Sequence, residues 1–240
     1  MIRRELKATA KLRMRSPVPN AIVIGLIYYL TIRALTTISQ SILYGPALRA
    51  FEEGAEEFLA LIEQGYTPDP NFIGTLLLIA IYVLTILIVY GFVLYSLTIS
   101  RSQPASVWTL FDGFATFFKV LWMYIRIYLV IALWSMLLFV PGIIAFYTYR
   151  QTPFIFADHP DWSVRQCMRE SKRLMRGNRR SLFLLDLSFL GWFFLSLFPF
   201  VLVYAQPFIM TTYALYYNQL IGWTPVLEET ALPEKSPWEY

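Results

Sequence analysis

Long apolar runs alternate with short charged segments along the whole chain. The apolar runs cover residues 20–44, 72–100, 120–139, 142–157, 182–197 and 201–220. A helix rises ~1.5 Å per residue, so a run of ~20 residues crosses ~30 Å of hydrocarbon, and tilting or local thinning accommodates a shorter run. The pattern predicts an all-α, polytopic membrane helical bundle with six transmembrane helices. We expect a single membrane domain over residues 1–220 and a flexible cytoplasmic tail over residues 221–240.

The number of spans depends on Pro141-Gly142, which interrupts the apolar sequence between residues 120 and 157. If the chain passes through this pair as a kink, there are five spans and residues 158–180 lie outside. If the pair forms a hairpin turn, there are six spans and this segment lies inside. Basic residues in short loops are retained in the cytoplasm, and residues 158–180 are rich in Arg and Lys. The charge pattern therefore favours the hairpin, with both termini cytoplasmic.

The first loop is acidic, in contrast to the basic segments on the predicted inner side. We expect Gly45-Pro46 to end the first span, because proline does not continue a helix. Apolar residues recur at helical spacing within residues 47–70, which predicts an acidic amphipathic helix. Such a helix either covers the outer mouth of the bundle or is simply solvated. Residues 111–114 (Phe-Asp-Gly-Phe) are expected to form a turn.

The clearest amphipathic pattern covers Ser163–Arg176. Apolar and small residues form one stripe, and the helix is expected to begin in a Ser163-x-x-Gln166 capping box and to end at Gly177-Asn178. Five cations on the other side are candidate contacts to an anionic lipid surface: Arg165, Arg169, Lys172, Arg173 and Arg176. Residues 1–19 are basic as well and predict a second interfacial helix, unless they are only a solvated tail.

Composition supports the membrane interpretation and excludes several kinds of site. The chain is 57% hydrophobic and 15% charged, whereas a soluble domain has about 25% charged residues. The single Cys and single His exclude a disulfide framework and the usual Cys/His zinc sites, so we expect neither a metal nor another cofactor. The cations are sorted into loops, which argues against a nucleic-acid partner. A cleavage site typical of a removable signal peptide is not recognisable, and neither is a catalytic motif, so we do not expect an enzyme.

Four ionisable residues fall within the predicted spans: Arg33, Arg126, Arg150 and Asp186. Such groups cost ~2.5–3.5 kcal/mol each at the bilayer centre and usually face a partner or a cavity. Arg126, Arg150 and Asp186 lie at similar predicted depths, so one hypothesis is a cationic pocket for a phosphate or carboxylate. The other is that Arg126 reaches the headgroups while Arg150 and Asp186 pair and fix helix packing. Asp158, at the membrane edge, is either a ligand group or the hydrogen-bond acceptor of its own turn.

Several motifs of the C-terminal half occur in a recognisable order. They include Pro141-Gly142-Ile143-Ile144, the segment 152–160 (Thr-Pro-Phe-Ile-Phe-Ala-Asp-x-Pro), Ser171-x-x-Leu174-Met175-x-Gly177-Asn178 and the segment 183–192. Together they resemble the bacterial integral membrane proteins classed as domain of unknown function 975. A looser likeness exists to the membrane domains that precede glycerophosphodiester phosphodiesterases, although no phosphodiesterase domain is recognisable here. The resemblance implies a six-helix bundle and supplies no reaction or ligand.

These observations lead to two hypotheses for function. The first is an integral protein of the bacterial cytoplasmic (plasma) membrane that binds, or helps to transport, an anionic small molecule or lipid. The alternative is a non-catalytic scaffold or assembly partner of another membrane complex. In both, the expected partners are membrane lipids, above all anionic lipids of the inner leaflet, and a membrane protein is a further candidate partner.

Overall fold

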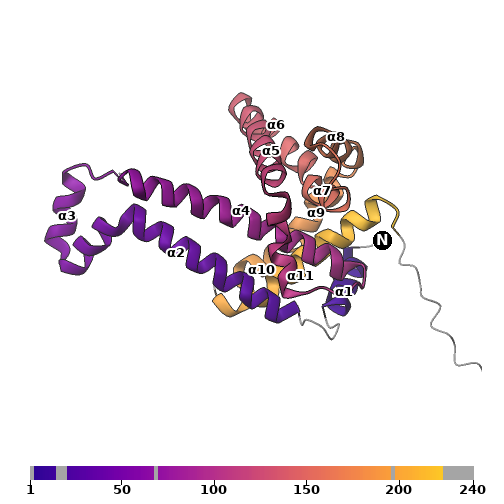
Figure 1. The fold of residues 1–240 in the computed structure, drawn as a ribbon, viewed down its shortest axis with the longest axis horizontal. Coiled ribbons are helices and arrows are strands. Elements are labelled where there is room, and N and C mark those ends of the chain that lie inside the picture. Colours follow the sequence, from indigo (N-terminus) through magenta and orange to yellow (C-terminus); the bar gives the residue numbers. More distant parts are fainter. Residues whose placement is uncertain (1–2, 15–20, 68–69, 196–197, 224–240) are drawn as a thin grey trace, which may run out of the picture.

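The computed structural model describes residues 3–14, 21–67, 70–195 and 198–223, which are helical and contain no strand (Figure 1). The predicted all-α class is therefore confirmed for this part of the chain. The helices are α1 (Arg3–Arg13), α2 (Ala21–Glu53), α3 (Ala55–Glu63), α4 (Phe72–Ser100), the 3-10 helix η1 (Val107–Thr116), α5 (Phe117–Leu137), α6 (Phe139–Tyr149), α7 (Thr152–Asp158), α8 (Val164–Leu174), α9 (Arg179–Leu187), α10 (Leu190–Leu195) and α11 (Pro199–Leu220).

Three helical segments in the described part of the chain are long and apolar enough to cross a membrane: Ala21–Gly45, Phe72–Ser100 and Val107–Leu137. The predicted span 142–157 is divided between α6 and α7 at Arg150-Gln151, and the predicted span 182–197 is divided between α9 and α10. The three segments indicate a membrane-associated protein. They do not support a count of six spans.

A long two-helix arm extends away from the rest of the molecule (Figure 1). It consists of α2 and α4, which contact one another. The candidate membrane span ends at Gly45, as predicted, but the helix does not break at Gly45-Pro46, because α2 continues through this pair to Glu53. A proline inside a helix removes one backbone hydrogen bond and adds some strain. The 33-residue helix α2 tolerates this local cost.

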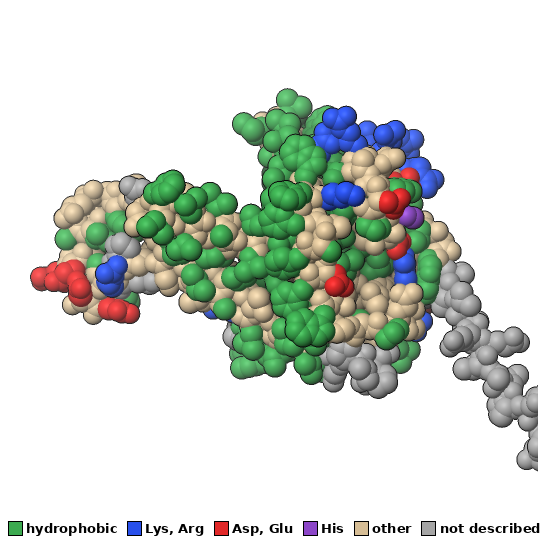
Figure 2. All heavy atoms as spheres, in the orientation of Figure 1, with side chains coloured by type: hydrophobic (Ala, Val, Ile, Leu, Met, Phe, Trp, Pro, Cys, Tyr) green, Lys and Arg blue, Asp and Glu red, His purple; other side chains and the backbone are tan. Residues whose placement is uncertain are grey.

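The acidic segment lies at the far end of this arm and not over the mouth of a bundle (Figure 2). The expected helix within residues 47–70 is split at Gly54, whose φ of 150° separates the end of α2 from α3. Phe51 and Phe58 pack edge to face across this break, with ring centroids 5.5 Å apart. Phe51 and Ile62 are nevertheless mostly exposed. The acidic end therefore presents both carboxylates and apolar side chains.

A second projection is the hairpin of α5 and α6, which run side by side (Figure 1). The chain reverses at Leu138, which has extended backbone angles, three residues before the Pro141-Gly142 pair that we expected to turn. Gly142 lies in α6 against Ser135 of α5, and a Cβ atom at this position would overlap Ser135. Glycine is thus required for close packing and not for the turn. The hairpin tip exposes Met136, Leu137, Leu138, Phe139 and Val140.

The remaining helices form the body around α11, which contacts α1, α2 and α4. The predicted N-terminal helix is present as α1, and its buried Leu6 and Ala10 pack within the protein core. The Lys7 ammonium donates to the Ser188 carbonyl at 2.7 Å, at the C-terminal end of α9. The backbones of η1 and α4 also pack in close contact. This is possible because Gly91 of α4 has no Cβ, which would overlap the Leu110 backbone of η1. The predicted Phe-Asp-Gly-Phe turn lies inside η1.

Candidate functional site

The four predicted intramembrane charges do not form one cluster. Arg150 and Asp186 meet, whereas Arg126 lies apart on α5, beside α8, and Arg33 is exposed on α2. The similar depths predicted for Arg126, Arg150 and Asp186 were therefore insufficient to bring these three side chains together. The structure separates one neutralised pair from a second, cationic region.

Arg150 and Asp186 form a compact hydrogen-bonded unit between α6, α9 and α11. The Arg150 Nη1 lies 2.6 Å from Asp186 Oδ2. The hydroxyls of Tyr147 and Tyr213 donate to the same carboxylate at 3.0 and 2.8 Å. The guanidinium also stands 4.5 Å from the centre of the Tyr213 ring, a distance suited to a cation–π contact. Both charges are thus satisfied within the protein, as the packing hypothesis requires.

A second ion pair was not expected from the sequence. Arg101, just after α4, binds Asp158 with two hydrogen bonds of 2.5 and 2.7 Å. Tyr217 donates to Asp158 at 2.8 Å, and Arg101 Nε donates to the Asn218 side chain at 3.1 Å. Asp158 is therefore a junction between α4, α7 and α11. Its carboxylate is occupied by these partners and not by the backbone of its own turn.

Helix α8 is held against the body by its less polar side. The predicted capping box is present, since Ser163 and Gln166 each accept from the other's backbone N–H. Cys167 is fully buried, and the Ser171 hydroxyl donates to the Thr148 carbonyl at 2.7 Å. Burial raises the pKa of the Cys167 thiol to about 11. Because this side of α8 packs against the body, the cations on the opposite side face outward. Basic side chains are seen over the body in Figure 2.

A groove of about 420 Å³ lies between α5 and α8. We call it the cationic groove, and it is lined by Arg126, Val130, Tyr149, Arg165, Met168, Arg169 and Lys172. Arg126 lies over the Trp122 ring at 5.5 Å. The lining contains four cations and no carboxylate. Arg126, predicted as a ligand contact, and three residues predicted as lipid-surface contacts thus meet in one place.

The other two predicted lipid-surface cations stand outside this groove. Arg173 forms an ion pair with Glu170 at 2.5 Å, and Arg176 is exposed. The ion pairs that the structure shows among the described residues are Arg101–Asp158, Arg150–Asp186 and Arg173–Glu170. None of the cations in the groove takes part in them. The groove consequently retains its full positive charge.

The remaining candidates for chemistry are engaged in packing. His159 stacks on Trp162, with ring centroids 4.2 Å apart. Within the described residues there is no group of three or more His, Cys, Asp or Glu side chains arranged to hold a metal ion. The arrangement can bind an anion.

Residues 136–223 match the family model described as "Protein of unknown function (DUF975)", which confirms the resemblance seen in the sequence. The matched segment begins at the hairpin tip and includes α8, Arg150 and Asp186, while Arg126 precedes it. The looser likeness to membrane domains of phosphodiesterases stays a prediction. Searches of curated proteins and of solved structures found no match.

Proposed function

We propose that this protein is an integral membrane protein that binds the phosphate group of an anionic ligand in the cationic groove. The observation that carries this proposal is the lining of the groove, in which Arg126, Arg165, Arg169 and Lys172 converge without a carboxylate. Guanidinium groups present planar sets of donors that match phosphate oxygens, and an ammonium adds a point charge. Four unpaired cations in one groove repel each other, and a bound anion relieves that repulsion.

The position of the groove suits a ligand at a membrane surface. Arg126 lies near the middle of α5, within the apolar segment Val107–Leu137, while Arg165, Arg169 and Lys172 come from the amphipathic helix α8. Anionic lipid headgroups attract surface cations by about 1 kcal/mol each. We place the groove at the inner leaflet of the bacterial cytoplasmic membrane, with both termini in the cytoplasm.

The reversal at Leu138 supports this orientation, since it returns the chain to the side on which α5 begins. The α5–α6 hairpin then enters the bilayer from the cytoplasmic side, and the arm carries its acidic end toward the other side. The six-span arrangement belongs to this proposal as its most specific form. Labelling of Leu138→Cys by an impermeant reagent from outside the cell is expected if α5 crosses fully, and protection would contradict a full crossing.

The test of binding compares two double variants with the same change of charge. Arg126→Leu with Arg169→Leu removes two cations of the groove, while Arg176→Leu with Arg180→Leu removes two exposed cations that do not line it. At about 1 kcal/mol per cation, the groove variant should bind phosphatidylglycerol about 10- to 30-fold more weakly than the wild type. The measurement is native mass spectrometry of detergent-solubilised protein, with phosphatidylcholine as the neutral lipid. Equal losses in both variants would overturn the groove as a specific site.

The scaffold hypothesis has one observation in its favour, the exposed acidic and apolar end of the arm. Phe51, Leu59 and Ile62 are more than half exposed there, next to Glu52, Glu53, Glu56 and Glu57. A protein partner with a basic, partly apolar surface would fit this end. Co-purification of a partner that is lost on changing Phe51 and Ile62 to Ser, but not on changing the groove, would support that second function.

A further inference from the structure

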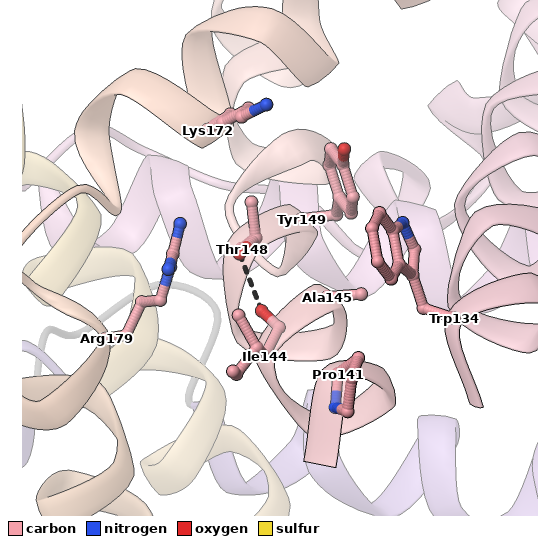
Figure 3. A pocket seen from close by; sticks show the side chains of 8 residues that line it. All are labelled: Trp134, Pro141, Ile144, Ala145, Thr148, Tyr149, Lys172 and Arg179. Atoms are coloured by element: carbon pink, nitrogen blue, oxygen red, sulfur yellow. Dashed lines mark hydrogen bonds between the residues drawn. The ribbon is translucent and has the colours of Figure 1, made fainter. Parts of the chain in front are cut away.

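A cleft of about 330 Å³ in the α5–α6 hairpin adjoins the cationic groove (Figure 3). We call it the hairpin cleft, and it is lined by Trp134, Pro141, Ile144, Ala145, Thr148, Tyr149, Lys172 and Arg179. Tyr149 and Lys172 also line the groove, so the two spaces meet at these residues. The cleft is therefore an extension of the proposed phosphate site.

The two ends of the hairpin cleft differ in chemistry. Lys172 and Arg179 extend from α8 and α9 at one end, while Trp134, Pro141 and Ile144 form an apolar wall toward the hairpin tip (Figure 3). The Thr148 hydroxyl donates to the Ile144 carbonyl at 2.6 Å, so this donor is already used within α6. The lining contains no carboxylate. The hairpin cleft thus combines a cationic end with an apolar interior.

Arg179 has an unsatisfied donor at the cationic end of the cleft. Its Nε atom is buried and has no hydrogen-bond partner among the described protein atoms. A buried donor of a charged group that stays unpaired is costly, so native structures nearly always satisfy it. Because this Nε atom is not solvent-accessible, an anionic oxygen in the cleft would accept from it only after the Arg179 side chain rotates.

We infer that the ligand of the groove is a membrane phospholipid, and that one of its acyl chains enters the hairpin cleft. This inference rests on the proposed phosphate-binding function and names its ligand class. A volume of about 330 Å³ lies at the lower end of ligand pockets, ~300–1,000 Å³, which suits one chain and not a whole two-chain lipid. Trp134 and Ile144 are almost half exposed, so the apolar end is open toward the surrounding bilayer. The second chain would remain in the bilayer.

The first test fills the cleft without touching the cations. Ile144→Trp places a large side chain in the cleft, and Ile143→Trp is the matched control, because Ile143 has similar exposure and does not line it. The probes are dioleoyl phosphatidylglycerol and water-soluble glycerol phosphate, which share the phosphate but not the chains. We expect Ile144→Trp to weaken lipid binding about 10-fold, the loss of roughly two buried methylene groups, and to leave glycerol phosphate binding unchanged.

The outcomes separate this inference from the function on which it rests. Unchanged lipid binding by Ile144→Trp, or an equal loss in Ile143→Trp, would overturn the acyl-chain assignment, while the groove variants could still bind phosphate more weakly. Groove variants that bind both probes like the wild type would overturn the phosphate site itself.

A second measurement uses the wild-type protein and does not depend on the folding of a variant. A phosphatidylglycerol with a photoactivatable diazirine in its acyl chain should form adducts on Trp134, Ile144 or Ala145 after illumination, as located by peptide mass spectrometry. Adducts confined to the arm or to α11 would contradict the inference.

Discussion

Arg126 and Arg150 are two arginines at similar predicted depth whose surroundings give them opposite roles. Arg150 has Asp186 at 2.6 Å and aromatic rings on several sides, so its charge is neutralised inside the protein. Arg126 faces a groove with three more cations and forms no ion pair with a described carboxylate. The comparison teaches that a charge within an apolar helix is a candidate for ligand recognition only where no partner inside the protein neutralises it. A paired charge indicates helix packing instead.

The largest expected effect comes from breaking the paired region. Asp186→Asn leaves Arg150 without a counter-charge and should lower the free energy of unfolding by about 3 kcal/mol. This is the low end of the range for buried pairs, because the two side chains retain 24% and 20% exposure. The measurement is unfolding of the purified protein in detergent. Arg126→Leu should leave this free energy nearly unchanged, and an equal loss there would erase the distinction between the two arginines.

An intermediate effect is expected from salt. Screening shortens the range of exposed charges from ~10 Å at 0.1 M to ~3 Å at 1 M salt, but acts less on partly buried pairs. Binding of phosphatidylglycerol at the cationic groove should therefore weaken severalfold across this range, while the destabilisation caused by Asp186→Asn should persist. Titrations of lipid binding and unfolding curves at both salt concentrations provide the check. Salt-independent lipid binding would count against the groove as an electrostatic site.

A further expected effect concerns α8, the helix that carries three of the four cations of the groove. Because burial raises the pKa of Cys167 from 9.0 to about 11, the fraction of thiolate near pH 8 should be about 100-fold below that of an ordinary cysteine. Labelling by iodoacetamide should be correspondingly slow and should accelerate as the pH approaches 11. Rapid labelling at pH 8 would mean that α8 leaves the body readily. The groove would then be transient, unlike the Arg150–Asp186 region.

The features predicted best were those that depend on residues close together in the sequence. The bounds of α4 and the Ser163–Gln166 capping box follow from local apolar composition and local hydrogen bonds, and the structure has both. The position of the hairpin turn was wrong by three residues, since Gly142 is needed for packing against Ser135 and not for reversing the chain.

Features that depend on the direction in which a helix faces could not be predicted in this way. The predicted depth of a residue says how far along a span it lies, but not which neighbouring helix its side chain faces. It therefore placed Arg126 and Arg150 at one level and left their partners undetermined. The interruption between α6 and α7 follows Arg150, and α9 presents Asp186 to it. The Arg101–Asp158 pair was missed for the same reason, because its members are 57 residues apart and no periodic pattern relates them.

The junction around Arg101 also bears on how the protein is made. Arg101 follows directly after the arm, and its Nε bonds to Asn218, which is synthesised 117 residues later. The arm is therefore synthesised early, but its end at Arg101 is locked only when α11 has emerged. Chains truncated before Asn218 should carry an inserted but unanchored arm, the kind of intermediate that membrane quality control would encounter.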